Sequence, residues 1–121
     1  MKKQIIITFT GLILSLVVYG QSNCPKGISN KDFKAFVKVI ESTEFTDTRL
    51  QLCQGFVKEN CVSVKQVVAL LDFFQLEKQK AEVAKAAYAN VVDKENFRSI
   101  YLKFKQEIYI REIETFVQSQ N

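Results

Sequence analysis

The chain has 121 residues, of which 47% are hydrophobic and 25% are charged, values that fit one globular domain with one hydrophobic core. Its formal net charge is +4; removal of Lys2 and Lys3 with the first twenty residues leaves 15 basic and 13 acidic residues, a net charge of +2. This balance gives no reason to expect nucleic acid as a partner, and the absence of histidine excludes His-dependent catalytic triads and the commonest zinc ligand.

The N-terminal segment has the pattern of a secretory signal peptide. Lys2 and Lys3 precede an apolar run over residues 5–18, and Gly20 supplies a small residue at its end. The run is shorter than the roughly 20 apolar residues that cross a membrane, and no lipobox precedes Cys24. We therefore predict that residues 1–20 are cleaved after Gly20, and that the mature protein is secreted or periplasmic with no integral membrane segment.

Residues 21–29 are predicted to form an N-terminal arm, and residues 30–121 a single helical domain. No stretch alternates strictly between apolar and polar residues, and no Asn-Gly or Asp-Gly hairpin turn occurs. Apolar residues recur instead at helical spacing. We predict an all-α fold, a compact array of about six short helices around a buried central helix. The helices are expected to start near 30 and 46 and to span 64–74, 76–92, the stretch after 93, and 106–117.

Polar residues that suit the N-cap position precede four of these helices: Asn30, Thr46 or Asp47, Ser63 and Asp93. Ser63 with Gln66 three residues later predicts a capping box. Gly55 falls inside the second helix, where glycine costs about 1 kcal/mol relative to alanine. A close contact with another helix would explain it.

The helix over residues 64–74 is apolar on nearly every side. Its only polar residues are Lys65, Gln66 and Asp72. A helix with this pattern is buried, with other helices packed around it. We therefore expect Val67, Leu70 and Leu71 at the centre of the domain.

Phenylalanines recur near the predicted turns. Phe45, Phe74 and Phe104 each follow an apolar helix at a spacing near 30 residues. The spacing is compatible with three degenerate helix-turn-helix repeats. Any six-helix protein with short loops gives a similar spacing, so both interpretations stay open.

The sequence holds no recognisable catalytic, metal or cofactor motif. The phosphate-binding, dinucleotide-binding and nucleophile-elbow patterns are all missing from a chain with four glycines. The acidic stretch after Asp93 lacks the glycine and the ligand spacing of a calcium loop. Glu107 and Glu114 are spaced as solvated helix-face residues rather than as a catalytic pair. We expect no enzyme activity, no cofactor and no metal.

Three cysteines enter an oxidising compartment, so we expect a disulfide and one remaining thiol. Cys53 and Cys61 are too far apart along a continuous helix to pair, and Cys53 lies on an apolar stripe. We favour Cys24–Cys61. A Cys24–Cys53 bridge and an intermolecular bridge remain alternatives.

Two features could form an interaction surface. Lys31, Lys34 and Lys38 make a basic stripe on the first helix, although such a stripe is usually a solvated face. The chain also holds ten phenylalanines, most of which we assign to the core. Phe73 and Phe74 point in different directions on a helix, so Phe73 is the candidate for exposure.

Residues 50–97, together with Arg49 just before them, carry a set of spaced motifs, among them Arg49-Leu50, Asn60-Cys61, Phe74-Gln75-Leu76-Glu77 and Asp93-x-x-Asn96-Phe97. In these the chain resembles the bacterial family called domain of unknown function 4476. The resemblance implies a small, exported, mostly helical module of Bacteroidetes-like bacteria with no established activity. It also implies pairing of Cys24 with Cys61. Ala81 and Cys53 depart from the family pattern, and both departures concern packing.

These observations together lead to a functional expectation. We expect an exported, non-catalytic protein-interaction or accessory module whose partner is an unidentified protein of the envelope or extracellular space. An apolar-ligand or lipid-binding protein is the alternative, favoured by the phenylalanine and tyrosine content.

The cleavage site gives the first test. The intact mass of the protein recovered from the periplasm or medium should correspond to a chain that begins at Gln21. Recovery of exported protein that still carries Met1 would contradict the signal-peptide prediction.

Overall fold

The computed structural model describes residues 24–121, so the predicted signal peptide over residues 1–20 lies outside the described part. The helices are α1 (Asn30–Glu41), α2 (Thr46–Glu59), α3 (Val64–Leu71), α4 (Glu77–Ala87), η2 (Tyr88–Asn90), η3 (Lys94–Lys103) and α5 (Glu107–Gln120). Within this range no strand forms, and only Val62 and Val91 pair, as an isolated bridge. With η2 taken as the end of α4, the predicted all-α class with six helices is confirmed.

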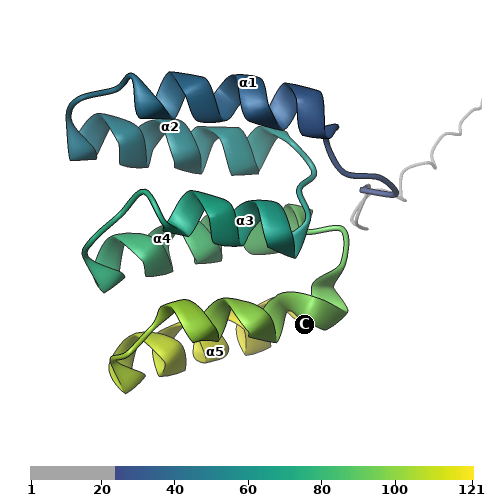
Figure 1. Ribbon diagram of the computed structural model, residues 1–121. Helices are drawn as coiled ribbons and strands as arrows, with labels where there is room; N and C mark the ends of the chain where they lie inside the picture. Colours follow the sequence, from purple (N-terminus) through teal and green to yellow (C-terminus); the bar gives the residue numbers. More distant parts are fainter. Residues whose placement is uncertain (1–23) are drawn as a thin grey trace, which may run out of the picture.

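The helices form three hairpins, α1–α2, α3–α4 and η3–α5, stacked one on the next (Figure 1). In this stack α2 packs on α4, α4 on α5, and α3 on η3. The turns within the hairpins (42–45, 72–76 and 104–106) lie at one end, which we call the turn end. The linkers between hairpins (60–63 and 91–93) lie at the other, the linker end. This arrangement favours the repeat interpretation of the sequence.

The phenylalanine spacing does not, however, mark equivalent positions in all three hairpins. Phe74 and Phe104 each stand two residues before the N-cap of the following helix, Leu76 or Gln106, and both are buried. Phe45 is itself the N-cap of α2 and is 72% exposed. The structural equivalent of Phe45 in the second hairpin is therefore Leu76, which is also exposed.

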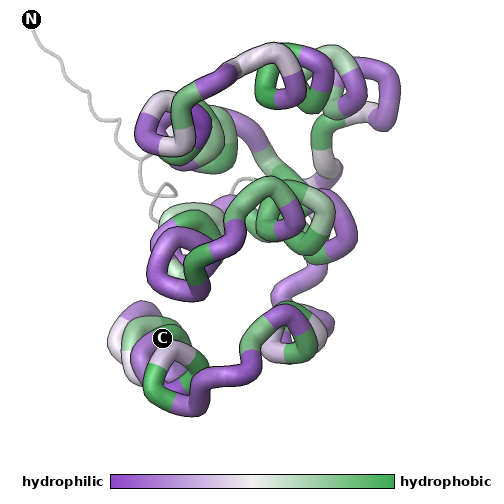
Figure 2. Tube along the Cα trace, turned by 60° about the vertical axis from the view of Figure 1, so that its left-hand side comes forward, coloured by the Kyte–Doolittle hydropathy of each residue, from purple (hydrophilic) through white to green (hydrophobic). Residues whose placement is uncertain are grey.

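Helix α3 supplies the centre of the core, as predicted. Val67, Leu70 and Leu71 are completely buried, and the Ser63–Gln66 capping box forms in both directions. The hydrophobic positions of the three hairpins face one another across the stack (Figure 2). The expectation that α3 is covered on all sides is wrong in part, because Val68 and Ala69 are only half-buried.

Several local predictions are corrected. Ser29, not Asn30, caps α1, since its Oγ accepts from Asp32 N at 3.1 Å. Neither Thr46 nor Asp47 caps α2, whose N-cap residue offers no side-chain hydrogen bond. A Cβ built on Gly55 meets no atom within 4 Å, so no close helix contact explains that glycine.

Three predicted helix ends also change. The third helix ends at Leu71 rather than at Phe74. The fourth helix ends at Ala87 and continues into η2 rather than reaching Val92. The fifth is a ten-residue 3₁₀ helix. The sixth runs to Gln120.

The N-terminal arm is fastened at the linker end. Cys24 and Cys61 form the predicted disulfide, with Cα atoms 5.4 Å apart. Ile28 N donates to Cys61 O at 2.7 Å, and Gln66 Nε2 donates to Ile28 O at 3.1 Å. The two cysteines are 37 residues apart in sequence. In the chain-entropy model, a bridge that closes such a loop lowers the entropy of the unfolded chain and so stabilises the fold by about 4 kcal/mol.

The two linkers are joined side by side. Val62 N donates to Asn90 O at 3.0 Å, and Val92 N donates to Val62 O at 2.9 Å. The Asn90 side chain donates to two carbonyls at the C-terminus of α2, at 3.1 and 2.8 Å. The Asp93 side chain makes no capping hydrogen bond to the backbone of its own helix, η3, but accepts from Val64 N at 2.9 Å, so it caps α3 from a distant part of the chain.

The Glu77 carboxylate hydrogen-bonds the second hairpin to the backbone of the third at the turn end. Glu77 accepts from Lys105 N at 2.8 Å and from Gln106 N at 2.9 Å. These two backbone N–H groups lower the pKa of Glu77. Because the folded pKa lies below the unfolded value of about 4.3, this stabilisation is present above that pH and is lost as the pH falls through the folded pKa.

Substitution Glu77→Gln should therefore lower the melting temperature near neutral pH, and the difference from the unsubstituted protein should shrink as the solution is acidified below about pH 4. Thermal denaturation followed by circular dichroism across this range measures the effect. Glu107→Gln is the matched control, because its ion pair with Arg111 is exposed, at 3.5 Å, and of little expected value. A difference for Glu77→Gln that stayed constant down to about pH 2 would contradict the assignment.

Candidate functional site

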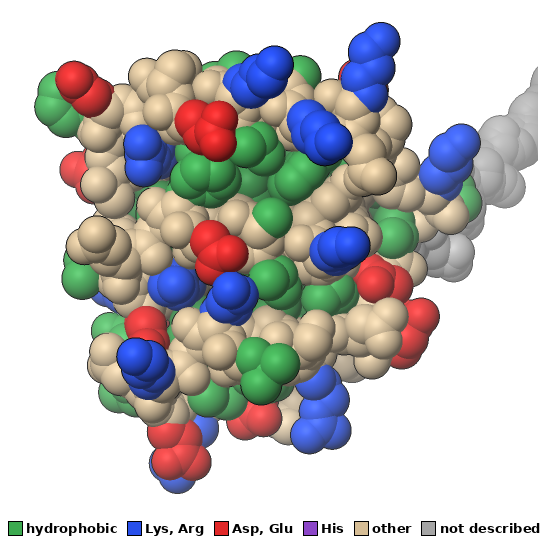
Figure 3. All heavy atoms as spheres, in the orientation of Figure 1, with side chains coloured by type: hydrophobic (Ala, Val, Ile, Leu, Met, Phe, Trp, Pro, Cys, Tyr) green, Lys and Arg blue, Asp and Glu red, His purple; other side chains and the backbone are tan. Residues whose placement is uncertain are grey.

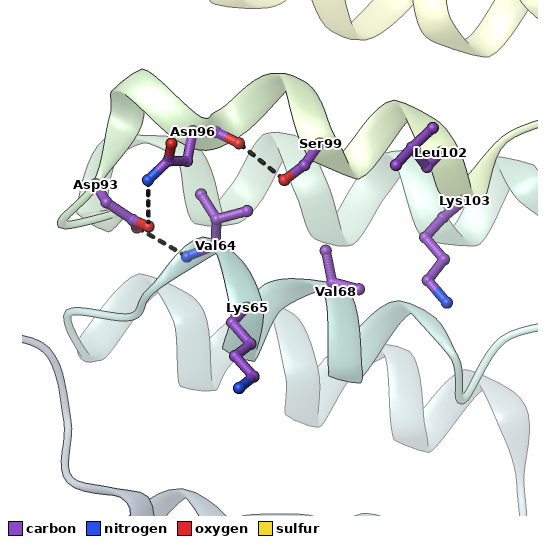
Figure 4. Close-up of a pocket in the computed structure, with 8 residues that line it drawn as sticks. All are labelled: Val64, Lys65, Val68, Asp93, Asn96, Ser99, Leu102 and Lys103. Carbon is purple, nitrogen blue, oxygen red and sulfur yellow. Dashed lines mark hydrogen bonds between the residues drawn. The ribbon is translucent and has the colours of Figure 1, made fainter.

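An apolar groove of about 370 Å³ runs between α3 and η3. Its lining is Val64, Lys65, Val68, Asp93, Asn96, Ser99, Leu102 and Lys103 (Figure 4). Val64 and Val68 point from α3 toward η3, and Leu102 stands on η3. We call this feature the α3–η3 groove.

The polar groups around the α3–η3 groove bond mainly to the protein itself. The Asp93 carboxylate accepts from Val64 N at 2.9 Å and from Asn96 Nδ2 at 3.2 Å. Lys103 Nζ lies 2.8 Å from Asp72 Oδ1. A ligand in the groove therefore meets an apolar surface, because the polar groups beside it already have partners. Lys65 is the exception, since it makes no ion pair with residues 24–121.

Leu102 is the most exposed of the large hydrophobic residues on this surface, at 88%. It lies off the buried stripe of η3, which contains Phe97 and Ile100. Covering such a side chain contributes about 1.5–3 kcal/mol. Hydrophobic side chains reach the surface on the face that carries α1, α3 and η3 (Figure 3), so Leu102 belongs to a face with further apolar area.

A second hollow of about 450 Å³ lies at the turn end, between α2 and the turn from α3 to α4. We call it the turn-end hollow; its lining is Thr46, Arg49, Phe73, Gln75, Leu76 and Gln79. Phe73, the predicted exposed phenylalanine, is half-buried here, whereas Phe74 is buried. The lining therefore combines the cation of Arg49 with the amides of Gln75 and Gln79 and with apolar side chains along one edge.

The predicted basic stripe lies apart from both hollows. Lys31, Lys34 and Lys38 are exposed on α1, and none of them lines the α3–η3 groove or the turn-end hollow. The structure therefore does not bring this stripe together with Phe73. Leu102 and Arg49 were not predicted as surface features, because a residue's exposure here depends on which hairpins stack beside it.

The carboxylates that were considered for catalysis are exposed to solvent. Glu107 and Glu114 are both exposed on α5, and Tyr109 is half-buried. In the part of the chain that the structure describes, no three Cys, Asp or Glu residues lie close enough to hold a metal, and no helix is long and apolar enough to span a membrane.

A family model, Domain of unknown function (DUF4476), matches residues 27–117. The chain belongs to this family. The match begins near the end of the arm and reaches Val117 in α5, so the DUF4476 domain corresponds to nearly all of the helical stack. No curated protein and no solved structure matches the chain.

The remaining thiol of this DUF4476 domain is that of Cys53. Its side chain is completely buried on α2, and burial raises its pKa to about 12, against a smaller opposing effect of the Arg49 charge. Since the thiolate is the reactive form, this cysteine should be chemically inert in the folded protein.

Iodoacetamide at about pH 8 should therefore leave Cys53 unmodified in the native domain and alkylate it once denaturant is added, with one added carbamidomethyl group by mass spectrometry. Rapid alkylation of the native, non-reduced protein would contradict the buried position.

Proposed function

We propose that this DUF4476 domain is an exported, non-catalytic protein-interaction module, and that the α3–η3 groove receives the apolar face of a helix from its partner. The observation that carries the proposal is Leu102, exposed beside an apolar groove. Helices dock in such grooves through apolar side chains spaced along one face. Lys65, without an ion pair among the described residues, suits an acidic residue at the edge of that helix.

The proposed location is the periplasm or the extracellular space. The signal-like pattern over residues 1–20 and the cysteine pairing support it, because disulfides persist in oxidising compartments. A non-catalytic role is supported by the solvent exposure of Glu107 and Glu114 and by the burial of the Cys53 thiol.

A lipid or other apolar ligand is the second candidate for the same groove. Its volume falls at the lower end of the range of about 300–1,000 Å³ that is typical of small-molecule sites. Under this alternative, native mass spectrometry of protein purified from its own cells shows a bound lipid mass, and Val68→Asp removes it.

The protein-interaction proposal is tested by a photoreactive amino acid placed at Leu102 in cells that export the domain. We expect one discrete crosslinked protein, which is absent when Val68→Asp is added and absent when the probe is moved to Ile108. Ile108 is a matched control because it is also exposed and apolar, at 67%, but does not line the groove.

Once the partner is identified, Leu102→Asp should weaken its affinity at least about tenfold and Ile108→Asp should leave it unchanged, by titration calorimetry. Crosslinking that stays empty, or an affinity that Leu102→Asp does not change, would contradict the proposed use of the groove.

A further inference from the structure

The turn-end hollow contains an arginine that has no acidic partner. Arg49 is half-buried on the first turns of α2 and lines the hollow. Its Nε donates to Thr43 O at 2.6 Å, which fixes the guanidinium in place. Among residues 24–121 no carboxylate oxygen lies within 4 Å of its nitrogen atoms, although Glu44 and Asp47 are close in sequence.

The terminal NH₂ groups of Arg49 are therefore available to a ligand, since no acceptor within the described chain bonds them. Holding a partly desolvated cation without a counter-charge costs free energy. An external anion that supplies the counter-charge removes this cost and therefore binds more tightly. Guanidinium groups match carboxylates with paired, charge-assisted hydrogen bonds.

The rest of the lining fits the same kind of ligand. Thr46, Gln75 and Gln79 add a hydroxyl and two amides, and no acidic residue lines the hollow. Phe73 and the 61%-exposed Leu76 provide an apolar edge. A ligand with a carboxylate beside an apolar group would satisfy both parts.

The hairpin repeat places a second base at the equivalent position of α4. Arg49 stands four residues after the N-cap of α2, and Lys80 stands four residues after the N-cap of α4. These two helices pack against each other, and Lys80 also makes no ion pair within the described residues. The charge of Lys80 favours the ionised form of the neighbouring Glu77 carboxylate, so Arg49 remains the cation of the hollow.

We propose that the turn-end hollow binds the side-chain carboxylate of an aspartate or glutamate in a partner protein, with Arg49 as the anion receptor and with Phe73 and Leu76 receiving the adjoining apolar side chain. This site is separate from the α3–η3 groove and does not depend on the role proposed for it.

The test uses the ¹⁵N-labelled mature protein and three probes: the blocked tripeptide acetyl-Leu-Asp-Leu-amide, its Asn counterpart, and sodium acetate. In NMR titrations the Asp peptide should shift the Arg49 Nε–H signal and the amide signals of the turns 42–45 and 72–76, with a Kd of about 1 mM. The Asn peptide and acetate should each bind at least about tenfold more weakly, because each lacks one part of the ligand.

Substitution Arg49→Gln should remove the response to the Asp peptide, whereas Arg98→Gln should preserve it. Arg98 is a matched control because it is an exposed arginine on η3 that lines neither hollow. Should Arg49→Gln fail to fold by circular dichroism, Gln79→Glu takes its place: it puts a carboxylate into the hollow, keeps the Arg49–Thr43 bond and should also abolish binding.

Four results would each overturn the proposal. The first two are equal affinity for the Asp and Asn peptides and acetate binding as tight as that of the Asp peptide. The others are an unchanged response in the folded Arg49→Gln or Gln79→Glu protein and the absence of any shift with the Asp peptide.

Discussion

The backbone at Cys61 and Val62 is the point on which the arrangement of the hairpins depends. Cys61 carries the disulfide to the arm, and its carbonyl accepts from Ile28 N. Val62 exchanges hydrogen bonds with the second linker, through Asn90 O and Val92 N. Buried backbone groups that lose such partners cost free energy. Two residues thereby hold the arm, the α2–α3 linker and the α4–η3 linker in one place.

The linker end, where these bonds gather, differs chemically from the turn end of the stack. At the linker end, side chains such as Asn90 and Asp93 are used to complete the backbone hydrogen bonds of other segments. At the turn end, the N-caps Phe45 and Leu76 offer no hydrogen bond and remain exposed. The linker end thus carries backbone bonds between three segments, whereas the turn end combines the Glu77 bonds to the third hairpin with exposed apolar N-caps.

Local pattern was enough to predict the helical class, the buried α3 and the Ser63–Gln66 cap, because helical periodicity and capping act within a few residues. Local pattern did not predict the hydrogen bond of Asp93, because its partner Val64 is 29 residues away. It also did not predict the exposure of Leu102 and Arg49, which depends on how the hairpins stack. The cysteine pairing was predictable because geometry disfavoured Cys53 with Cys61 and the family resemblance pointed the same way.

The disulfide also determines how tension would travel through the molecule. A pull applied at the arm before Cys24 passes through the sulfur atoms to Cys61 and bypasses the 37-residue separation between them. Helices α1 and α2 lie between the two cysteines, so the disulfide transmits the force past them. Helix α3 and the elements after it bear the force directly. Under a stretching force the first hairpin would lose its packing against α4 when the second hairpin unravels, but its own chain would stay closed by the disulfide.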